Sequence, residues 1–410
     1  MSSNGLRLGE ELISPLHALY DGLSVEGKAR PAERSQTHPV WVVTRYEDAK
    51  VILSHAGVRR DGQGALDLYA KRSKDVPRDV GASLGKHMLN SDQPDHGRMR
   101  TLVRSAFTTG HVERLRPYVE NITEVMLDDM ARRSKADLME DFAVPLTIAV
   151  ICELLGVPES EREHVRMSWR QQAEVLDPDT AEELANSQAR YLNELLDTKL
   201  KEPKDDVFSG LAKAAADGHL NETELVSMAH LLLMSGFETT MNMIGNAMVT
   251  LLINPDQLTQ LRKDPSLMPT AIEELVRYDS PVQASMLRYT VEDIELKDVT
   301  IPAGEYVLVS NRLANHDPDR FESPGTLDLN RKADGHLGYG YGAHYCIGAQ
   351  LARLESGIAI KRLIERFPRL ELAVKPEQLQ WLPITFLRAL IEVPVWLEGQ
   401  PADQRHEGED

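Results

Sequence analysis

One cysteine lies near the end of an unusually glycine-rich segment, in a setting that suits metal chemistry. Residues 338–348 read GYGYGAHYCIG. Because glycine lacks a Cβ, such a segment forms a loop whose backbone can approach a flat bound group closely. From Gly348 onward, Leu351 and Leu354 recur at helical spacing, so Cys346 is predicted to lie at a helix N-terminus, where backbone N–H groups favour a thiolate. A thiolate held in this way suits the axial position of a haem iron.

Two other interpretations of this cysteine were weighed. A buried cysteine beside a glycine-rich turn is the default for a single cysteine. A zinc site is disfavoured because the chain has two cysteines, Cys152 and Cys346, with no paired spacing.

Small and polar residues interrupt the apolar centre of the longest predicted helix, residues 221–253. Ser235-Gly236 is followed closely by Glu238 and Thr239, and glycine inside a helix costs about 1 kcal/mol relative to alanine. Thr239 is predicted to bond to the Ser235 carbonyl, which bends a helix. A buried Glu238 would need partners or water. Taken alone, the segment is also explained by an exposed glutamate and a simple threonine back-bond.

Two charged pairs share helix faces. His96 and Arg100 are four residues apart, and Glu274 and Arg277 are three apart. The first pair could clamp an anion, with arginine supplying a fork of donors, although, taken alone, the pair is better explained by a solvated basic face. The second, if it were exposed, would contribute only about 0–1 kcal/mol to stability.

Taken in their order along the chain, from His96 to Cys346, the four segments resemble the cytochrome P450 superfamily, in particular its soluble bacterial-type haem-thiolate monooxygenases. Tyr339 stands where the family usually has phenylalanine, and Glu238 where many relatives have aspartate. The resemblance covers nearly the whole chain. It implies haem b (iron protoporphyrin IX) with the Cys346 thiolate as axial ligand and metal-binding residue, and a mainly α fold with a small β portion.

The resemblance also implies roles for individual residues. Glu238 and Thr239, with Thr240, would organise water and relay protons during dioxygen activation. The cofactor-binding residues it implies are His96, Arg100, Arg288, His344, Cys346, Gly340 and Gly348. The substrate pocket it implies is lined by Leu231, Leu232, Ser235, Phe237, Val282, Ala284, Met286, Ile384 and Phe386.

The pair Glu274 and Arg277 is structural in the resembled family, where it is buried behind the cysteine loop. A third partner belongs to it, and either Arg331 or His336 supplies it here. Residues 59–84 have little periodicity and are predicted to be a long loop. In the family this position carries a lid over the pocket.

The implied reaction inserts one oxygen atom from O2 into an unactivated C–H bond of a largely apolar small molecule. We expect a tailoring hydroxylase of secondary metabolism, acting on a polyketide or macrolide, a terpenoid or a peptide. Epoxidation, desaturation, ring coupling, peroxide-driven oxidation and a non-catalytic haem sensor remain alternatives. Electrons would come from a ferredoxin and its NAD(P)H-dependent reductase, docked near Arg104, Arg353 and Arg362.

Composition sets the outer limits. The net charge of −18 in 410 residues argues against nucleic-acid binding, which needs a basic face. The two cysteines form no disulfide framework, which fits the cytoplasm. Residues 1–14 contain no apolar signal core, and the apolar run 142–155 is too short to span a bilayer. We expect a monomer with one catalytic domain, residues 1–398, and a disordered polar tail, residues 399–410.

Overall fold

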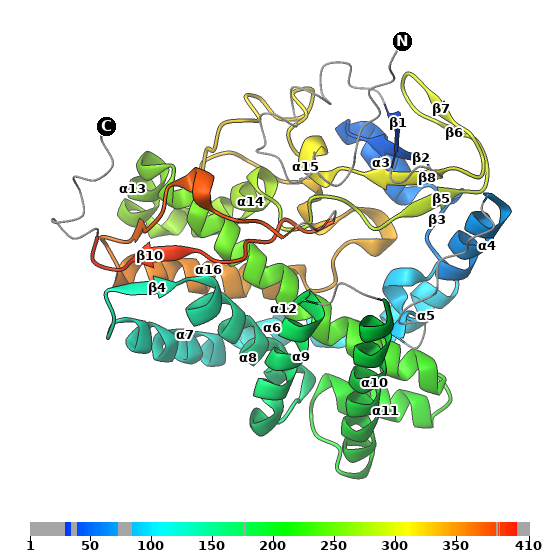
Figure 1. Ribbon diagram of the computed structural model, residues 1–410, viewed down its shortest axis with the longest axis horizontal. Helices are drawn as coiled ribbons and strands as arrows, with labels where there is room; N and C mark the ends of the chain where they lie inside the picture. Colours follow the sequence, from blue (N-terminus) through cyan, green and yellow to red (C-terminus); the bar gives the residue numbers. More distant parts are fainter. Residues whose placement is uncertain are drawn as a thin grey trace.

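Helices make up most of the molecule. The strands of the larger sheet lie at the upper right of Figure 1, and β4 and β10 of a smaller sheet lie at the left. The computed structural model describes residues 29–33, 39–72, 84–174, 178–382, 384 and 386–399. The predicted mainly α, single-domain fold is confirmed, while residues 400–410 of the predicted tail lie outside the described part. The helices are α3 (Tyr46–Ser54), α4 (Gly62–Arg72), α5 (Asp95–Val103), α6 (Thr109–Arg114), α7 (Arg116–Met130), α8 (Val144–Leu155), α9 (Arg162–Glu174), α10 (Pro178–Lys201), α11 (Val207–Ala216), α12 (Glu222–Leu252), α13 (Pro255–Lys263), α14 (Met268–Tyr278), α15 (Asn311–Ala314) and α16 (Ala349–Arg366).

The strands form three sheets. The larger sheet has the order β1-β2-β8-β5-β3, in which β2 and β8 run parallel and the other pairs antiparallel. Arg288, at the start of β5, is fixed and buried by this sheet. The strands are β1 (Arg30–Glu33), β2 (Pro39–Val43), β3 (Val58–Arg59), β4 (Lys135–Asp137), β5 (Arg288–Thr290), β6 (Ile294–Glu295), β7 (Thr300–Ile301), β8 (Tyr306–Val309), β9 (Glu371–Leu372) and β10 (Pro394–Trp396).

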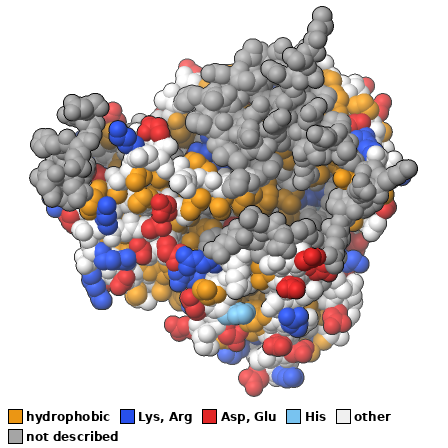
Figure 2. Space-filling model, in the orientation of Figure 1, with side chains coloured by type: hydrophobic (Ala, Val, Ile, Leu, Met, Phe, Trp, Pro, Cys, Tyr) orange, Lys and Arg blue, Asp and Glu red, His pale blue; other side chains and the backbone are white. Residues whose placement is uncertain are grey.

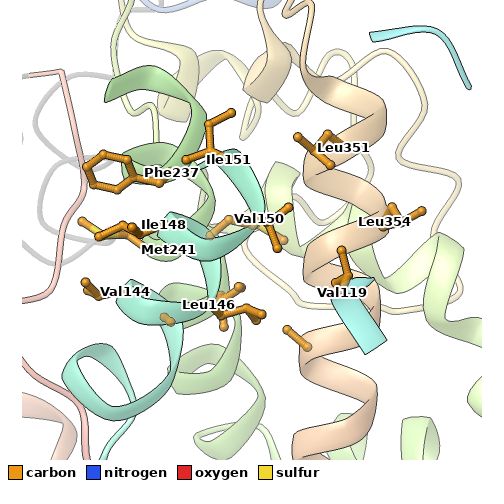
Figure 3. Packing of buried hydrophobic residues seen from close by; sticks show 14 of the residues in the cluster. Val119, Val144, Leu146, Ile148, Val150, Ile151, Phe237, Met241, Leu351 and Leu354 are labelled. Carbon is orange, nitrogen blue, oxygen red and sulfur yellow. The ribbon is translucent and has the colours of Figure 1, made fainter. Parts of the chain in front are cut away.

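The long helix α12 passes through the centre of the helical region (Figure 1). It begins with a capping box, in which Asn221 accepts from the Glu224 backbone N–H and the Glu224 carboxylate accepts from the Asn221 N–H. Its apolar side packs against α8, where Phe237 lies among the side chains of α8 (Figure 3). Gly236 faces α8 so closely that a Cβ there would collide with the side chain of Ile151. The glycine therefore sets how near the two helices lie.

Helix α4 corrects the prediction of a long loop over residues 59–84. Residues 62–72 are helical, although none of their side chains is fully buried. The Asp61 carboxylate accepts from the Gly64 N–H at 2.7 Å, and the Tyr306 hydroxyl donates to the Ala65 carbonyl at 2.7 Å. One of these two partners, Tyr306, comes from a distant strand, so the local sequence pattern alone does not indicate the helix. Residues 73–83 lie outside the described part.

A buried ion-pair network ties α14 to the chain before the cysteine loop. Glu274 and Arg277 are both 0% exposed and form two hydrogen bonds, of 2.7 and 2.8 Å. Arg277 also donates to the carbonyls of Asn315 and Pro324. Arg331 Nε lies 3.1 Å from Glu274 Oε1 and is the third partner. Glu274 and Arg277 bond to each other and also to groups near Asn315, Pro324 and Arg331. The network therefore fixes the positions of these three segments relative to α14.

His336, the other candidate for that position, contacts the neighbouring glutamate instead. Its Nε2 lies 3.1 Å from Glu273 Oε2, and Arg353 binds the same carboxylate at 2.6 Å. Of the two adjacent glutamates of α14, Glu274 therefore binds Arg331, and Glu273 binds His336 and Arg353.

Removing one member of the buried network should destabilise the fold strongly. The Arg277→Met variant leaves the Glu274 carboxylate without its main partner, and such a change costs about 3–5 kcal/mol. The matched control is Arg369→Met, because Arg369 pairs with Glu398 at the surface and should contribute less than about 1 kcal/mol. Denaturant unfolding of both proteins measures the difference. Equal effects would show that the network has no structural importance.

Candidate functional site

Cys346 lies between a glycine-rich loop and the start of α16. Its backbone N–H donates to the Tyr339 carbonyl at 2.8 Å, and Gly340 and Gly342 have φ angles of 75° and 72°, which favour glycine. The surrounding protein desolvates the thiol and raises its pKa, against the lowering effect of the Gly348 N–H and of nearby arginines. The side chain is nevertheless accessible. Because the Cys346 sulfur lies deep in the protein and is still accessible, we infer that it borders a hollow.

Five basic side chains converge beside this cysteine. The rings of His96 and His344 lie 4.0 Å apart, and Arg100 Nη2 donates to the Tyr345 carbonyl at 2.7 Å. The other two members are Arg60 and Arg288, which are 7% and 5% exposed. We refer to His96, Arg100, His344, Arg60 and Arg288 as the basic cluster.

Among the described residues, the negative charge near the basic cluster is too small to balance its positive charge. Burial, together with the charge of Arg288, lowers the pKa of Arg60 to about 9, and burial lowers that of Arg288 to about 10. Burial and four neighbouring cationic groups lower the pKa of His344 to about 2. Asp92 is the acid that opposes these shifts for Arg60 and Arg288.

Three nitrogens of the basic cluster also lack hydrogen-bond partners in the part of the chain that the structure describes. They are Arg60 Nε, Arg288 Nε and His96 Nε2, all buried. Buried polar atoms are normally satisfied, so this arrangement is suited to an anionic group that supplies acceptors and charge together.

One face of α12 presents hydroxyl groups, as the sequence predicted. Thr239 Oγ1 donates to the Ser235 carbonyl at 3.0 Å, and Ser235 Oγ donates to the Leu231 carbonyl at 2.5 Å. Ser235 is exposed and Thr239 half-buried, whereas Thr240 is buried with a long contact, 3.5 Å, to the Gly236 carbonyl. The hydroxyls of Ser235 and Thr239 therefore lie on the accessible side of the helix.

The comparisons with known proteins agree with this geometry. Residues 146–387 match the family model described as cytochrome P450. The chain belongs to the cytochrome P450 family. It is 45% identical to cytochrome P450 107B1 of Saccharopolyspora erythraea, over 90% of this chain and 92% of that protein. It is 39% identical to the cytochrome P450 monooxygenase PikC of Streptomyces venezuelae, over 97% and 95%.

A solved structure is similar over nearly the whole chain. The tirandamycin C-bound P450 monooxygenase TamI superposes with a TM-score of 0.88 and 38% identity, covering 96% of this chain and 100% of that one. The protein is therefore a cytochrome P450 monooxygenase, and a haem-thiolate iron cofactor is implied. The residues present fit it, because haem carries two carboxylates and the basic cluster has unpartnered donors beside an accessible thiol.

The predicted pocket residues fall into two groups. Met286 and Phe386 are 37% and 38% exposed, and Val282 and Ile384 are half-buried, so these four remain pocket candidates. Ala284 is fully buried in a cluster with strands β2 and β8. Leu231 and Leu232 are 8% and 3% exposed.

The assignment of Phe237 to the pocket is not supported. At about 100° per residue it lies about 200° around the helix from Ser235. It is 0% exposed in the core, beside Ile148 and Ile151 of α8 (Figure 3). Helical periodicity therefore places it opposite the accessible face of α12.

The sequence patterns do not identify Arg60 as a member of the basic cluster. It lies in a polar stretch between β3 and α4, and its backbone N–H donates to Asp92 Oδ2 at 3.1 Å. Side chains alternate along an extended segment, so the adjacent Arg59 and Arg60 are expected to point to opposite sides. This alternation is a sequence signal that one of the two arginines is directed into the protein.

No helix in the described ranges is both long and apolar enough to cross a membrane. On the face shown in Figure 2, acidic and basic side chains are interspersed and hydrophobic side chains gather across the middle.

The Arg60→Met variant should affect the cofactor-free and cofactor-loaded proteins in opposite directions. Without cofactor, loss of one positive charge relieves repulsion, so thermal stability should rise. With cofactor, loss of a charged hydrogen bond should speed haem transfer to excess apomyoglobin by about tenfold.

Arg59→Met is the matched control, because Arg59 is adjacent but lies outside the basic cluster. It should leave haem transfer unchanged. Equal transfer rates for wild type and Arg60→Met would contradict the assignment of Arg60 to the cofactor.

Proposed function

We propose that this cytochrome P450 hydroxylates an unactivated C–H bond of a largely apolar polyketide or macrolide, in a tailoring step of secondary metabolism. The observation that carries the proposal is an accessible cysteine sulfur deep inside the protein, beside a basic cluster that lacks an anion. The substrate class is supported by relatives named polyketide biosynthesis cytochrome P450 PksS and 6-deoxyerythronolide B hydroxylase, 39% and 37% identical. Terpenoids and peptides are the other scaffolds to test.

We assign the cofactor as haem b, which Cys346 would hold through its thiolate. When bound, the haem would supply the chemistry of dioxygen activation, which a thiolate ligand favours. His96, Arg60 and Arg288 would offer their unpartnered nitrogens to the haem carboxylates. Arg100 has a second task, because its bond to the Tyr345 carbonyl holds the cysteine loop.

Proton delivery is assigned to the hydroxyl face of α12. Thr239 donates its proton to the Ser235 carbonyl, so its oxygen lone pairs are left to accept a hydrogen bond from water. Glu238 is half-buried, and its carbonyl accepts from Asn242 at 2.8 Å. The carboxylate of Glu238 would resupply protons to water held at Thr239 Oγ1.

The Thr239→Ala variant should separate NAD(P)H consumption from product formation. Without the hydroxyl, water is held poorly, so product per NAD(P)H should fall about tenfold, within the usual range for general acid–base groups. Peroxide-driven turnover should persist, because it bypasses dioxygen activation.

The neighbouring Thr240→Ala variant is the control, since the Thr240 hydroxyl is buried and contacts the Gly236 carbonyl. The Thr240→Ala variant should form as much product per NAD(P)H consumed as the wild type. The relay assignment fails if Thr239→Ala keeps both rates and its coupling.

A ferredoxin is the proposed electron donor, with its NAD(P)H-dependent reductase. Arg104 is exposed and forms no ion pair with any described residue. Of the other predicted docking residues, Arg353 binds Glu273 at 2.6 Å and Arg362 lies 3.4 Å from Glu124. Arg104 thus has the most charge available for an acidic partner.

Reversing that charge should weaken ferredoxin binding. We expect Arg104→Glu to raise the KM for ferredoxin several-fold at low salt, with the difference shrinking at high salt as screening increases. Arg362→Glu should act less, because the arginine charge is already offset by Glu124. A KM unaffected by Arg104→Glu would place the docking site elsewhere.

Visible absorption of the ferric protein tests the proposed function directly. A panel of macrolides, linear polyketides, terpenoids and peptides is titrated, and a substrate that displaces axial water shifts the haem band to the high-spin position. A saturable shift with a polyketide or macrolide, followed by a hydroxylated product, is expected. Absence of a thiolate-type spectrum for the reduced protein with carbon monoxide would remove Cys346 as the ligand.

Epoxidation is the second candidate reaction. A relative 37% identical is named mycinamicin IV hydroxylase/epoxidase, so one family member is described by both reactions. Product analysis of a substrate that contains an alkene distinguishes them.

A further inference from the structure

Two histidines outside the basic cluster lie deep in the protein, on two elements that contact each other. His87 precedes the short turn Met88–Asn90 and is 8% exposed, and His230 lies on α12 and is half-buried. Burial lowers the pKa of each ring to about 4. The His87 ring is also affected by the charge of His230 and of Arg60, so both rings are neutral at physiological pH.

The hydrogen bonds of these rings define their tautomers. His87 Nδ1 accepts from the Asn90 backbone N–H at 3.3 Å, so its proton is on Nε2. His230 Nε2 lies 3.2 Å from Gln188 Oε1, while the Gln188 amide nitrogen donates to Ser168 Oγ at 3.0 Å. Because Gln188 Oε1 is an acceptor, His230 carries its proton on Nε2, and His230 Nδ1 is left as an acceptor.

The second nitrogen of each ring is available. Neither His87 Nε2 nor His230 Nδ1 forms a hydrogen bond with any residue that the structure describes. Neither nitrogen is one of the buried polar atoms that lack a partner, so both are accessible. Each ring is therefore deep but accessible at one nitrogen, as Cys346 is at its sulfur. The Met88 backbone N–H lies 3.4 Å from Met228 Sδ, so the turn that follows His87 packs against α12 two residues before His230. The two rings therefore lie near one another, and the charge of Arg60, a member of the basic cluster, also acts on the His87 ring.

We propose that His87 and His230 form a paired donor–acceptor site that binds a hydroxyl group of the substrate. The His87 N–H donates to the substrate oxygen, and His230 Nδ1 accepts the substrate O–H. A hydroxyl is both donor and acceptor, so it satisfies the two nitrogens at once. A carboxylate would face the lone pair of His230. The proposal rests on the proposed function, since the occupant is the substrate of that enzyme.

The position of the pair gives it a role in orientation. His230 lies on the same helix as Ser235 and Thr239, about 1.4 turns before Ser235 and about 2.5 turns before Thr239. His230 is also joined through Gln188 to α10 and through Ser168 to α9. A hydroxyl bound there would fix one end of an otherwise apolar substrate relative to the cysteine, and the other end would lie closer to the reacting centre.

The test uses three probes that differ in one group: 1-decanol, decyl methyl ether and decanoic acid. Dissociation constants are measured with the haem-loaded protein by calorimetry and by the haem band shift. At pH 7.5 the alcohol should bind about fivefold tighter than the ether, which accepts but cannot donate. His87→Leu and His230→Leu should each abolish this preference.

Two variants serve as controls. His87→Gln supplies an amide donor in place of the His87 N–H and should keep part of the preference, whereas His219→Gln changes an exposed histidine and should keep all of it. A preference that survives in both leucine variants would overturn the proposal, since binding to the haem iron itself would then explain it. The carbon monoxide spectrum of each variant reports separately on the proposed function.

A pH series on the wild type separates the two possible occupants. His230 faces His87 and Gln188, and His87 faces His230 and Arg60. With a hydroxyl bound, affinity should be flat from pH 6 to 9 and fall below about pH 5, where protonation makes His230 Nδ1 a donor. Tighter binding of decanoic acid than of decanol, with uptake of a proton at pH 6–7, would instead assign the pair to carboxylates.

Discussion

Positive charge buried without a matching anion is the constraint on which the site depends. An isolated buried charge costs several kcal/mol even after relaxation, yet five basic groups converge beside Cys346, and all three arginines among them have lowered pKa values. The fold must therefore hold these groups together against their repulsion. The larger sheet fixes Arg288, α5 supplies His96 and Arg100, and the cysteine loop carries His344. A ligand with two carboxylates converts this repulsion into binding.

A buried ion-pair network gives the cysteine loop rigid support. The buried network of Glu274, Arg277 and Arg331 links α14 to the segment that leads into the cysteine loop. The histidine pair is held differently, because the contacts of His230 run through a side-chain amide and a hydroxyl to α10 and α9. Cofactor binding therefore depends on fully buried ion pairs, and substrate recognition on neutral hydrogen bonds.

Sequence patterns predicted the parts of the site that are encoded locally. The glycine loop, the bond of Thr239 to Ser235 and the pairing of Glu274 with Arg277 each follow from spacing within a few residues. Helix α4 was missed because its stabilising partners, including Tyr306, come from elsewhere in the chain. Arg60 was missed for the same reason, since its burial depends on the packing of distant segments. Arg331 was left open, although it is the one arginine between residues 321 and 346.

The contact between Gly236 and Ile151 leaves α12 with one variable face. Any side chain at position 236 would push α8 away and disturb the core that includes Phe237. Positions 235 and 239 face the accessible side and have no such restriction. New substrate preferences can therefore arise by exchange of residues on that side, while the other side preserves the helix spacing. The same enzyme scaffold can diversify in what it oxidises without changing how it is assembled.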